Sequence, residues 1–316
     1  MLFQPIDDKQ ECVGVYTGGT LHFEDIPKNL TRTWRPGVDY GDNIEYAWIY
    51  AQGKNMSDAC PEHLKDEWDK ISRRMTAYKK SFDIAKINLR NHCFFDLVPH
   101  DSLVSFCDIK NQITSHIFEN NEKPPNYEYL VEAEKLLYKI KYQDLKLDSS
   151  DCRSLFTSTK LRDGSKKIMS GAPYINYNLF GTVTGRLTTQ CGSFPILTMK
   201  RELRRLIKPY NDWFISMDYN GAEARTVLAL SEQRQPEDDI HNWNIVNVFK
   251  NPDMHREEAK TMFFAWLYNP DSPDLKTNHY DRKKVLDRYY DGEYITTVFG
   301  RNIKVSDWKA LNYLIQ

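Results

Sequence analysis

One segment near the C-terminus constrains the fold more than any other, because both of its ends can be read from the sequence. Asn251-Pro252-Asp253 offers an N-cap, a proline at the first helical position and an acid in the first turn. Asn269-Pro270 is a typical helix stop. The residues between these two signals are therefore predicted to form a helix of about four and a half turns.

The two faces of this predicted helix differ in chemistry. Residues that recur every four positions lie along one arc, and this arc carries two cations followed by two rings: Arg256, Lys260, Phe264 and Tyr268. The opposite arc is apolar and is expected to face the core: Ala259, Met262, Phe263 and Trp266. Cations can hold a triphosphate while rings stack on a base and a sugar, so the order fits one nucleotide laid along the helix. An ordinary amphipathic helix with surface cations would leave the rings on the cationic arc unexplained.

Composition excludes several classes of protein. With 316 residues, 41% hydrophobic and 28% charged, the chain is too apolar to be disordered and can build one large or two to three small domains. It has no apolar run of the roughly 18 residues that a membrane span needs and no signal peptide, so no membrane association and a cytoplasmic location are expected. The six cysteines form no C-x-x-C pair, which favours reduced thiols over a zinc or redox site. The net charge of -1 does not by itself indicate a nucleic-acid partner.

The first part of the chain predicts a mixed α/β unit without evident chemistry. Alternation over residues 11–16, a Gly18-Gly19 turn and the apolar residues that follow predict a β-hairpin. Helices are expected from about Pro61 to Ala85. After Lys-Pro-Pro, near residue 124, a packed helix is expected to bury one face: Leu130, Ala133, Leu136, Leu137 and Ile140.

The charge pattern changes after about Thr157. Basic residues then outnumber acids strongly up to position 208: Lys160, Arg162, Lys166, Lys167, Arg186, Lys200, Arg201, Arg204, Arg205 and Lys208. A surface that follows a phosphate backbone needs such a stretch, although charge alone fits an ordinary solvated face equally well.

The residues that follow place two carboxylates close together. Residues 213–217 are predicted to form a buried strand that ends in Asp218, before a helical run at 221–230 that contains Glu223 and Arg225. A carboxylate at a strand end and another one turn into the next helix can face one crevice, which suits Mg²⁺ and an anionic substrate. Acids at strand ends are common, so this pattern alone also fits a purely structural role.

Several motifs together resemble family A DNA polymerases. The run from Asp218 to Arg225 resembles the first polymerase motif of that family, and the arc from Arg256 to Tyr268 resembles its nucleotide-binding helix at all four positions. Further blocks in the same order resemble other family segments: Thr184-Gly185-Arg186-Leu187-Thr188-Thr189 with Arg204, Asp239-Ile240-His241, Phe299-Gly300-Arg301, and Asn312 with Gln316.

The resemblance implies an α/β (α+β) right-hand fold that adds deoxynucleotides to a primer on template DNA with Mg²⁺. The implied division is a degenerate 3′–5′ exonuclease-like scaffold at 1–120, a reduced thumb at 121–165, the first part of the palm at 166–232, compact fingers at 233–290 and a return to the palm at 291–316. The region 1–120 lacks an Asp-x-Glu near its first strand, so a scaffold role is expected there and not nuclease activity.

The resemblance also implies roles for single residues. Asp218 and the backbone carbonyl of Tyr219 match the metal-binding positions, and Glu223 matches the steric gate against ribose. Arg256, Lys260 and His241 match triphosphate contacts, and Asp218 and Lys260 are the residues expected to be catalytic. The resemblance implies that Phe264 lies by the sugar and Tyr268 by the templating pair. The residues matched to duplex contacts are Arg186, Arg204, Asn312 and Gln316.

The sequence departs from the family pattern at four points that bear on the expected polymerase activity. Asn269 stands where the family has Gly, Trp308 replaces an expected Arg, and the connection from His241 to Arg256 is short. The second catalytic aspartate of the family would fall beyond Gln316, and two-metal catalysis needs both carboxylates. The 316-residue chain is therefore expected to be inactive alone, with the rest of the palm supplied by further sequence or a second polypeptide. The alternative is a non-catalytic primer-template binding protein derived from a polymerase.

Overall fold

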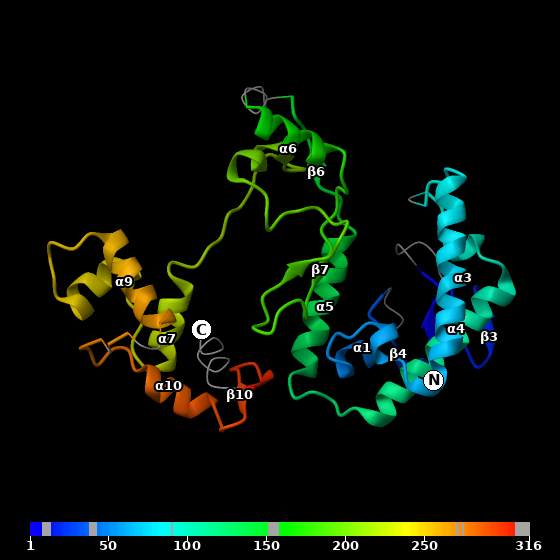
Figure 1. The fold of residues 1–316 in the computed structure, drawn as a ribbon, viewed down its shortest axis with the longest axis horizontal. Coiled ribbons are helices and arrows are strands. Elements are labelled where there is room, and N and C mark those ends of the chain that lie inside the picture. Colours follow the sequence, from blue (N-terminus) through cyan, green and yellow to red (C-terminus); the bar gives the residue numbers. More distant parts are fainter. Residues whose placement is uncertain are drawn as a thin grey trace. The chain divides into compact units, whose positions relative to one another are not determined.

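The computed structural model describes residues 1–7, 14–37, 43–89, 91–150, 158–269, 272–273 and 275–306. The chain forms two compact units, Met1–Tyr210 and Asn211–Gln316 (Figure 1). Both combine helices with small sheets, which agrees with the expected mixed class. The predicted palm range, 166–232, spans the boundary between the two units. Within the described ranges no helix has the length and apolar character needed to cross a bilayer.

The sheets of the first unit are small. Strands β1 (Gln4–Pro5), β2 (Val15–Thr17) and β3 (Thr20–His22) form an antiparallel sheet in that order, and β4 (Arg32–Thr33) pairs in parallel with β5 (Glu45–Tyr46). Gly18 and Gly19 turn from β2 into β3 with φ of 57° and 83°, values that residues with a Cβ rarely adopt. The predicted hairpin is therefore confirmed where it is described; Glu11, Cys12 and Val13 lie outside those residues.

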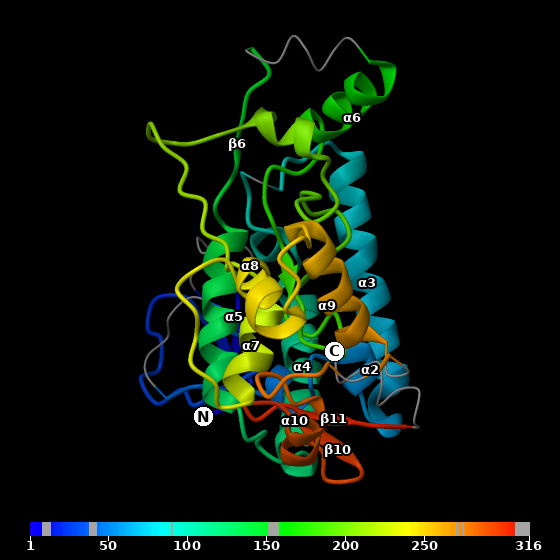
Figure 2. The same ribbon diagram turned by 90° about the vertical axis from the view of Figure 1, so that its left-hand side faces the viewer.

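Long and short helices together supply most of the core of the first unit. The long helices are α3 (Lys65–Ile84), α4 (His100–Asn120) and α5 (Tyr127–Lys141), and the short ones are α1 (Ala47–Tyr50), α2 (Met56–Ala59), η1 (Glu62–Leu64) and η2 (Phe95–Leu97). Helices α3 and α4 lie side by side (Figure 1, Figure 2). The helix expected between Pro61 and Ala85 is confirmed.

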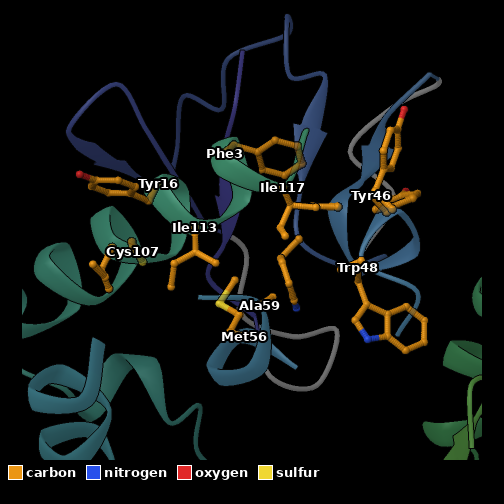
Figure 3. Packing of buried hydrophobic residues seen from close by; sticks show 14 of the residues in the cluster. Phe3, Tyr16, Tyr46, Trp48, Met56, Ala59, Cys107, Ile113 and Ile117 are labelled. Carbon is orange, nitrogen blue, oxygen red and sulfur yellow. The ribbon is translucent and has the colours of Figure 1, made fainter. Parts of the chain in front are cut away.

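Helix α4 is the centre of that core. It contacts β1, β2, α1, α2 and α3, and its Ile113 and Ile117 lie among Phe3, Met56 and neighbouring side chains (Figure 3). Helix α5 also begins after the proline pair as predicted and buries Leu130 and Leu137. The prediction for Leu136 was wrong.

Leu136 is 58% exposed because consecutive helical residues point about 100° apart, so it leaves the face that buries Leu137. Cys60 and Cys107 are free cysteines buried in this core.

The remainder of the first unit has its own small core around Ile168, Phe194, Leu203 and Leu206. Its elements are β6 (Lys146–Leu147) paired with β9 (Ile207–Lys208), α6 (Thr159–Met169), β7 (Tyr177–Asn178) paired with β8 (Thr188–Thr189), and η4 (Arg201–Leu206). Every basic residue of the 160–208 stretch is exposed except Lys208, which is half-buried.

The second unit is built from helices around one apolar cluster. Its elements are α7 (Ala222–Leu230), α8 (Ile240–Asn244), the π-helical turn η5 (Ile245–Phe249), α9 (Arg256–Tyr268), α10 (Arg282–Tyr289) and the hairpin β10 (Tyr294–Thr296) with β11 (Asn302–Lys304). Ala224, Leu228, Ile240 and Phe263 are fully buried where α7, α8 and α9 meet.

The prediction of a buried strand at residues 213–217 was wrong. This segment has no regular secondary structure, and Trp213, Ile215 and Met217 are 80%, 84% and 89% exposed. A strand needs a partner for its backbone groups, and the segment pairs with none of the residues that the structure describes. Without such pairing its apolar side chains gain no burial.

Candidate functional site

Helix α9 begins later than its sequence signals indicate and ends where predicted. Its N-cap is His255, where His255 and Glu258 form a capping box, and not Asn251. The Asn251 side chain instead accepts a hydrogen bond from the Asp253 amide at 3.2 Å in the preceding turn. Two competing start signals lie four residues apart, and the second forms the cap.

The predicted faces of α9 are correct except at one position. Ala259, Phe263 and Trp266 are buried as expected, whereas Met262 is 49% exposed and Leu267 is buried in its place. The buried positions follow an i, i+4, i+7, i+8 spacing, and Met262 lies at the edge of that stripe. Arg256 is exposed, and Lys260, Phe264 and Tyr268 are half-buried along the other arc.

The rings of this arc meet residues from α7 and α8. Phe264 and Tyr268 stack with centroids 5.5 Å apart and planes 9° apart, and the His241 ring lies 5.8 Å from that of Phe264. Tyr268 Oη donates to Glu223 Oε1 at 3.5 Å, a long contact. Residues separated by up to 45 positions in sequence thus form one continuous row.

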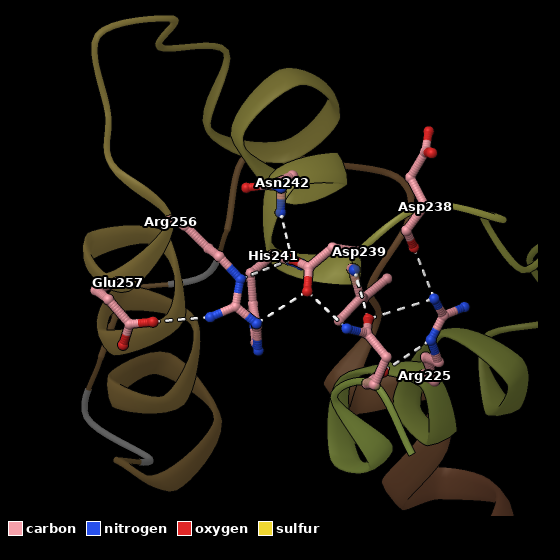
Figure 4. Close-up of polar contacts among 9 residues, drawn as sticks. Arg225, Asp238, Asp239, His241, Asn242, Arg256 and Glu257 are labelled. Carbon is pink, nitrogen blue, oxygen red and sulfur yellow. Dashed lines mark hydrogen bonds and ion pairs between the residues drawn. The ribbon is translucent and has the colours of Figure 1, made fainter. Parts of the chain in front are cut away.

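Asp239 links the three helices at the other end of this row. Its carboxylate accepts from Arg256 Nη2 at 2.9 Å and Nε at 3.2 Å, and from Asn220 Nδ2 at 2.6 Å (Figure 4). The same carboxylate caps α8 by accepting from the amides of His241 and Asn242, both at 3.0 Å. We call Asn220, Asp239 and Arg256 the Asp239 network.

The charges of Asp239 and Arg256 compensate one another. The Arg256 guanidinium holds the pKa of the Asp239 carboxyl well below its usual range, and hydrogen bonds from Asn220 and the Asn242 amide act in the same direction. In turn, the hydrogen bond to Asp239 raises the pKa of Arg256. Arg256 also donates to Glu257 Oε1 at 2.7 Å. The first cation of the predicted arc is therefore already paired with carboxylates.

The loop after Asp218 is fixed by Asn220, Gly221 and Arg225. Asn220 Oδ1 accepts from the Ile240 amide at 2.9 Å, and Arg225 donates to the backbone carbonyls of Asn220 and Asp238 (Figure 4). Arg225 also donates to the carbonyl of Pro236. Gly221 has φ of 62°, and a Cβ there would lie 2.3 Å from Ile240 Cγ2. Only glycine combines this conformation with so close an approach.

His241 and Lys260 differ in accessibility. His241 is 2% exposed, its Nδ1 has no hydrogen-bond partner among the described residues, and burial lowers its pKa. A phosphate reaches this imidazole only if neighbouring side chains move. Lys260 makes no hydrogen bond or ion pair in the described part of the chain, and its charge acts on His241.

The predicted metal-binding residues lie on the exposed segment. Asp218 is exposed and Tyr219 is 81% exposed. Across the described residues, no three His, Cys, Asp or Glu side chains are placed to hold a metal ion. The Asp218 carboxylate and Tyr219 carbonyl are nevertheless oxygen donors of the kind Mg²⁺ takes, and Mg²⁺ commonly completes its shell with substrate phosphates and water.

The predicted duplex contacts belong either to the first unit or to residues that the structure does not describe. Arg186 and Arg204 belong to the first unit and are both exposed. Asn312, Gln316 and Trp308 lie outside the described residues. Sequence reasoning gave Asp239 no role, although an acid before an apolar helical run is a typical N-cap. Its pairing with Arg256, 17 residues away, has no local signal.

No protein-family model matches the chain, and no curated protein sequence matches it significantly.

Proposed function

We propose that the chain takes part in template-directed DNA synthesis, as the nucleotide-binding part of a family A type DNA polymerase. One observation carries the proposal. Glu223, His241, Arg256, Phe264 and Tyr268 come from three helices and are the residues that the motif resemblance assigns to a single nucleotide. Four of them lie in one connected row of ring contacts and a hydrogen bond, and Arg256 joins this row through Asp239, which accepts from the His241 amide.

The proposed roles follow the order of side chains along α9. Arg256 and Lys260 would bind the triphosphate through charge-assisted hydrogen bonds, Phe264 would pack on the sugar and Tyr268 would lie by the templating pair. Glu223, held by Tyr268, would exclude a ribose hydroxyl. Lys260 is the cation open to phosphate, whereas Arg256 must first exchange Asp239 for the incoming anion.

Mg²⁺ would be held by Asp218, the Tyr219 carbonyl and oxygens of the triphosphate, and would neutralise charge on the phosphates. The exposed cations between Lys160 and Lys208 would track the primer-template backbone. A second polypeptide would supply further palm residues, and the exposed apolar residues Trp213, Ile215 and Met217 offer a surface on which it would pack.

Nucleotide binding tests the proposal directly. We expect deoxynucleoside triphosphates with Mg²⁺ to bind the chain in titration calorimetry, and Lys260→Ala to weaken binding about tenfold or more. Lys283→Ala removes an exposed lysine of α10; it is the control and should leave affinity unchanged. Asp239→Asn should tighten binding, because it releases Arg256 while an asparagine still caps α8. Equal affinities for Lys260→Ala and Lys283→Ala would disprove the assignment.

A second measurement distinguishes an enzyme from the binding module that is the alternative. Primer extension that Asp218→Ala abolishes indicates catalysis, and Glu223→Ala should then admit ribonucleotides far better relative to deoxynucleotides. Primer-template binding that persists with no extension under any condition favours the binding module. In both cases neutralising Arg186, Arg204 and Lys208 should lower the salt slope of DNA binding by about 0.9 per lost phosphate contact.

A further inference from the structure

The first unit contains a recess that the proposed function does not use. It has a volume of about 410 Å³ and lies between β1, the segment at 34–37, α4, α5 and β7. Its walls carry charged or polar groups and rings: Gln4, Asp7, Arg35, Lys110, Glu134, Lys141 and Asn176, with Trp34, Phe95, Tyr138, Tyr142 and Tyr177. We call it the Arg35 recess.

Two cations of this recess are held in place by rings behind them. The Arg35 guanidinium lies 3.8 Å from the centroid of the Trp48 ring, and Lys110 Nζ lies 5.3 Å from that of Phe106. Both side chains are half-buried, and burial lowers the pKa of each. Arg35 Nε is buried and has no hydrogen-bond partner among the described residues. The two positive charges are thus positioned but poorly compensated.

Glu134 is the carboxylate that acts on Arg35, and it supplies only part of the missing charge. Burial raises the pKa of Glu134 to about 7, against the opposing attraction of Arg35 and Lys141, so Glu134 is partly protonated at neutral pH. Asp7 accepts a hydrogen bond from Tyr138 Oη at 3.2 Å. Burying a cation without a full countercharge costs free energy, and an anion entering from solvent would recover part of that cost.

Gln4 adds a second uncompensated group. Its side chain is fully buried, and Nε2 donates to Asn111 Oδ1 at 2.9 Å and Thr114 Oγ1 at 3.1 Å, which fixes the orientation of the amide. Gln4 Oε1 has no partner in the part of the chain that is described. A buried amide oxygen left unpaired costs free energy, and native structures commonly satisfy such atoms with water or a ligand.

We propose that the Arg35 recess binds a small organic anion, in which a phosphate or carboxylate group lies between Arg35 and Lys110 and an attached planar ring packs against the ring-lined wall. The volume of the recess lies within the range of small-molecule sites, which are mostly apolar with a few converging polar groups. A guanidinium matches the planar oxygen pairs of both anion types.

Titration calorimetry with four probes tests the ligand class. Adenosine monophosphate represents a phosphate ester with a ring, benzoate a carboxylate with a ring, adenosine the ring without charge and inorganic phosphate the charge without a ring. We expect at least one of the two ring-bearing anions to bind, and the tighter of them to exceed both adenosine and inorganic phosphate by about tenfold or more. The ring-bearing anion that binds more tightly shows whether the recess prefers a phosphate or a carboxylate. Adenosine binding as tightly as its monophosphate, or no binding by either ring-bearing anion, would overturn the proposal.

Two variants with opposite expected effects assign the binding to the recess. Lys110→Met keeps the aliphatic stem and should weaken the tighter anion about tenfold, whereas Glu134→Gln removes a competing negative charge and should tighten it severalfold. Lys70→Met on the exposed face of α3 is the matched control and should change nothing. Thermal unfolding shows whether each variant is folded. If Lys110→Met is folded and binds like the control, the anion does not occupy this recess.

Discussion

Two parts of the second unit carry similar apolar side chains, but the side chains of one part are exposed and those of the other are buried. At residues 213–217 Trp213, Ile215 and Met217 are more than three-quarters exposed, whereas Ile240 and Phe263, in α8 and α9, are fully buried. The difference is not composition. The helices satisfy their own backbone hydrogen bonds and are linked by the Asp239 network, so their apolar faces are held together. The 213–217 segment forms no strand pairing with any described residue.

The comparison shows that polar contacts decide which apolar residues become core. Asp239 caps α8, contacts the loop before α7 through Asn220 and contacts the first residue of α9 through Arg256. Each contact alone is worth little at a partly exposed site. Together they fix three helix starts, and Ile240 lies directly beside the residue that makes them. The candidate nucleotide-binding row is built on this arrangement.

The largest expected effect on stability is the difference between two Ile→Ala substitutions, one in each region. Ile240→Ala should destabilise the second unit by about 2–5 kcal/mol, because it leaves a cavity beside Gly221 and the α7–α9 core. Ile215→Ala should cost less than about 0.5 kcal/mol, because its side chain is already 84% exposed. Hydrogen exchange measured on peptides of α7, α8 and α9 reports the stability of this unit separately.

The Ile215→Ala protein is the internal control for that experiment. A cost for Ile215→Ala close to that of Ile240→Ala would mean that the 213–217 segment is buried in solution, and that the strand predicted from sequence forms there.

Local signals allowed much of this region to be predicted. Spacing by four residues placed Arg256, Lys260, Phe264 and Tyr268 on one arc, and the stop at Asn269 was correct. The start was wrong because Asn251 and His255 both offer a cap, and a sequence does not show which one the following chain will use. Likewise, the apolar run at 213–217 predicts burial only if a partner strand exists. Whether it does depends on residues far away in sequence.

The next largest loss of stability is expected on substitution of Gly221. Gly221→Ala should destabilise the second unit by about 2–4 kcal/mol, since it combines the cost of a left-handed backbone with a Cβ 2.3 Å from Ile240 Cγ2. Gly292→Ala is the matched control: Gly292 also has positive φ, 103°, but nothing lies within 4 Å of the added carbon. Its cost should therefore be confined to backbone strain. Equal effects in the two variants would show that close approach to Ile240 does not matter.

Two substitutions at Asp239 distinguish the contribution of the helix cap to stability from that of the ion pair. Asp239→Ala should cost about 1 kcal/mol more than Asp239→Asn, because asparagine keeps an oxygen for the amides of His241 and Asn242 while alanine does not. The two variants lose the same ion pair with Arg256. Urea unfolding followed by hydrogen exchange of α8 measures the difference. If both variants lose the same stability, the charge and not the cap holds α8 in place.

The smallest effect is the pH dependence of the ion pair itself. The pKa of Asp239 is depressed in the folded chain, so its contribution is fully present above the unfolded value of about 3.9 and is lost as pH falls through the folded pKa. The stability difference between the parent and Asp239→Asn should therefore be constant from about pH 5 to 7 and shrink below about pH 4.

Comparison within this pair isolates Asp239, because the other carboxyls of the unit with lowered pKa, Glu232 and Asp291, are present in both proteins and cancel. Hydrogen exchange of α8 and α9 at several pH values, corrected for intrinsic exchange rates, provides the measurement. A difference that does not change between pH 3 and 7 would mean that Arg256 does not pair with Asp239 in solution. The first cation of the candidate site would then already be open to a phosphate, as Lys260 is.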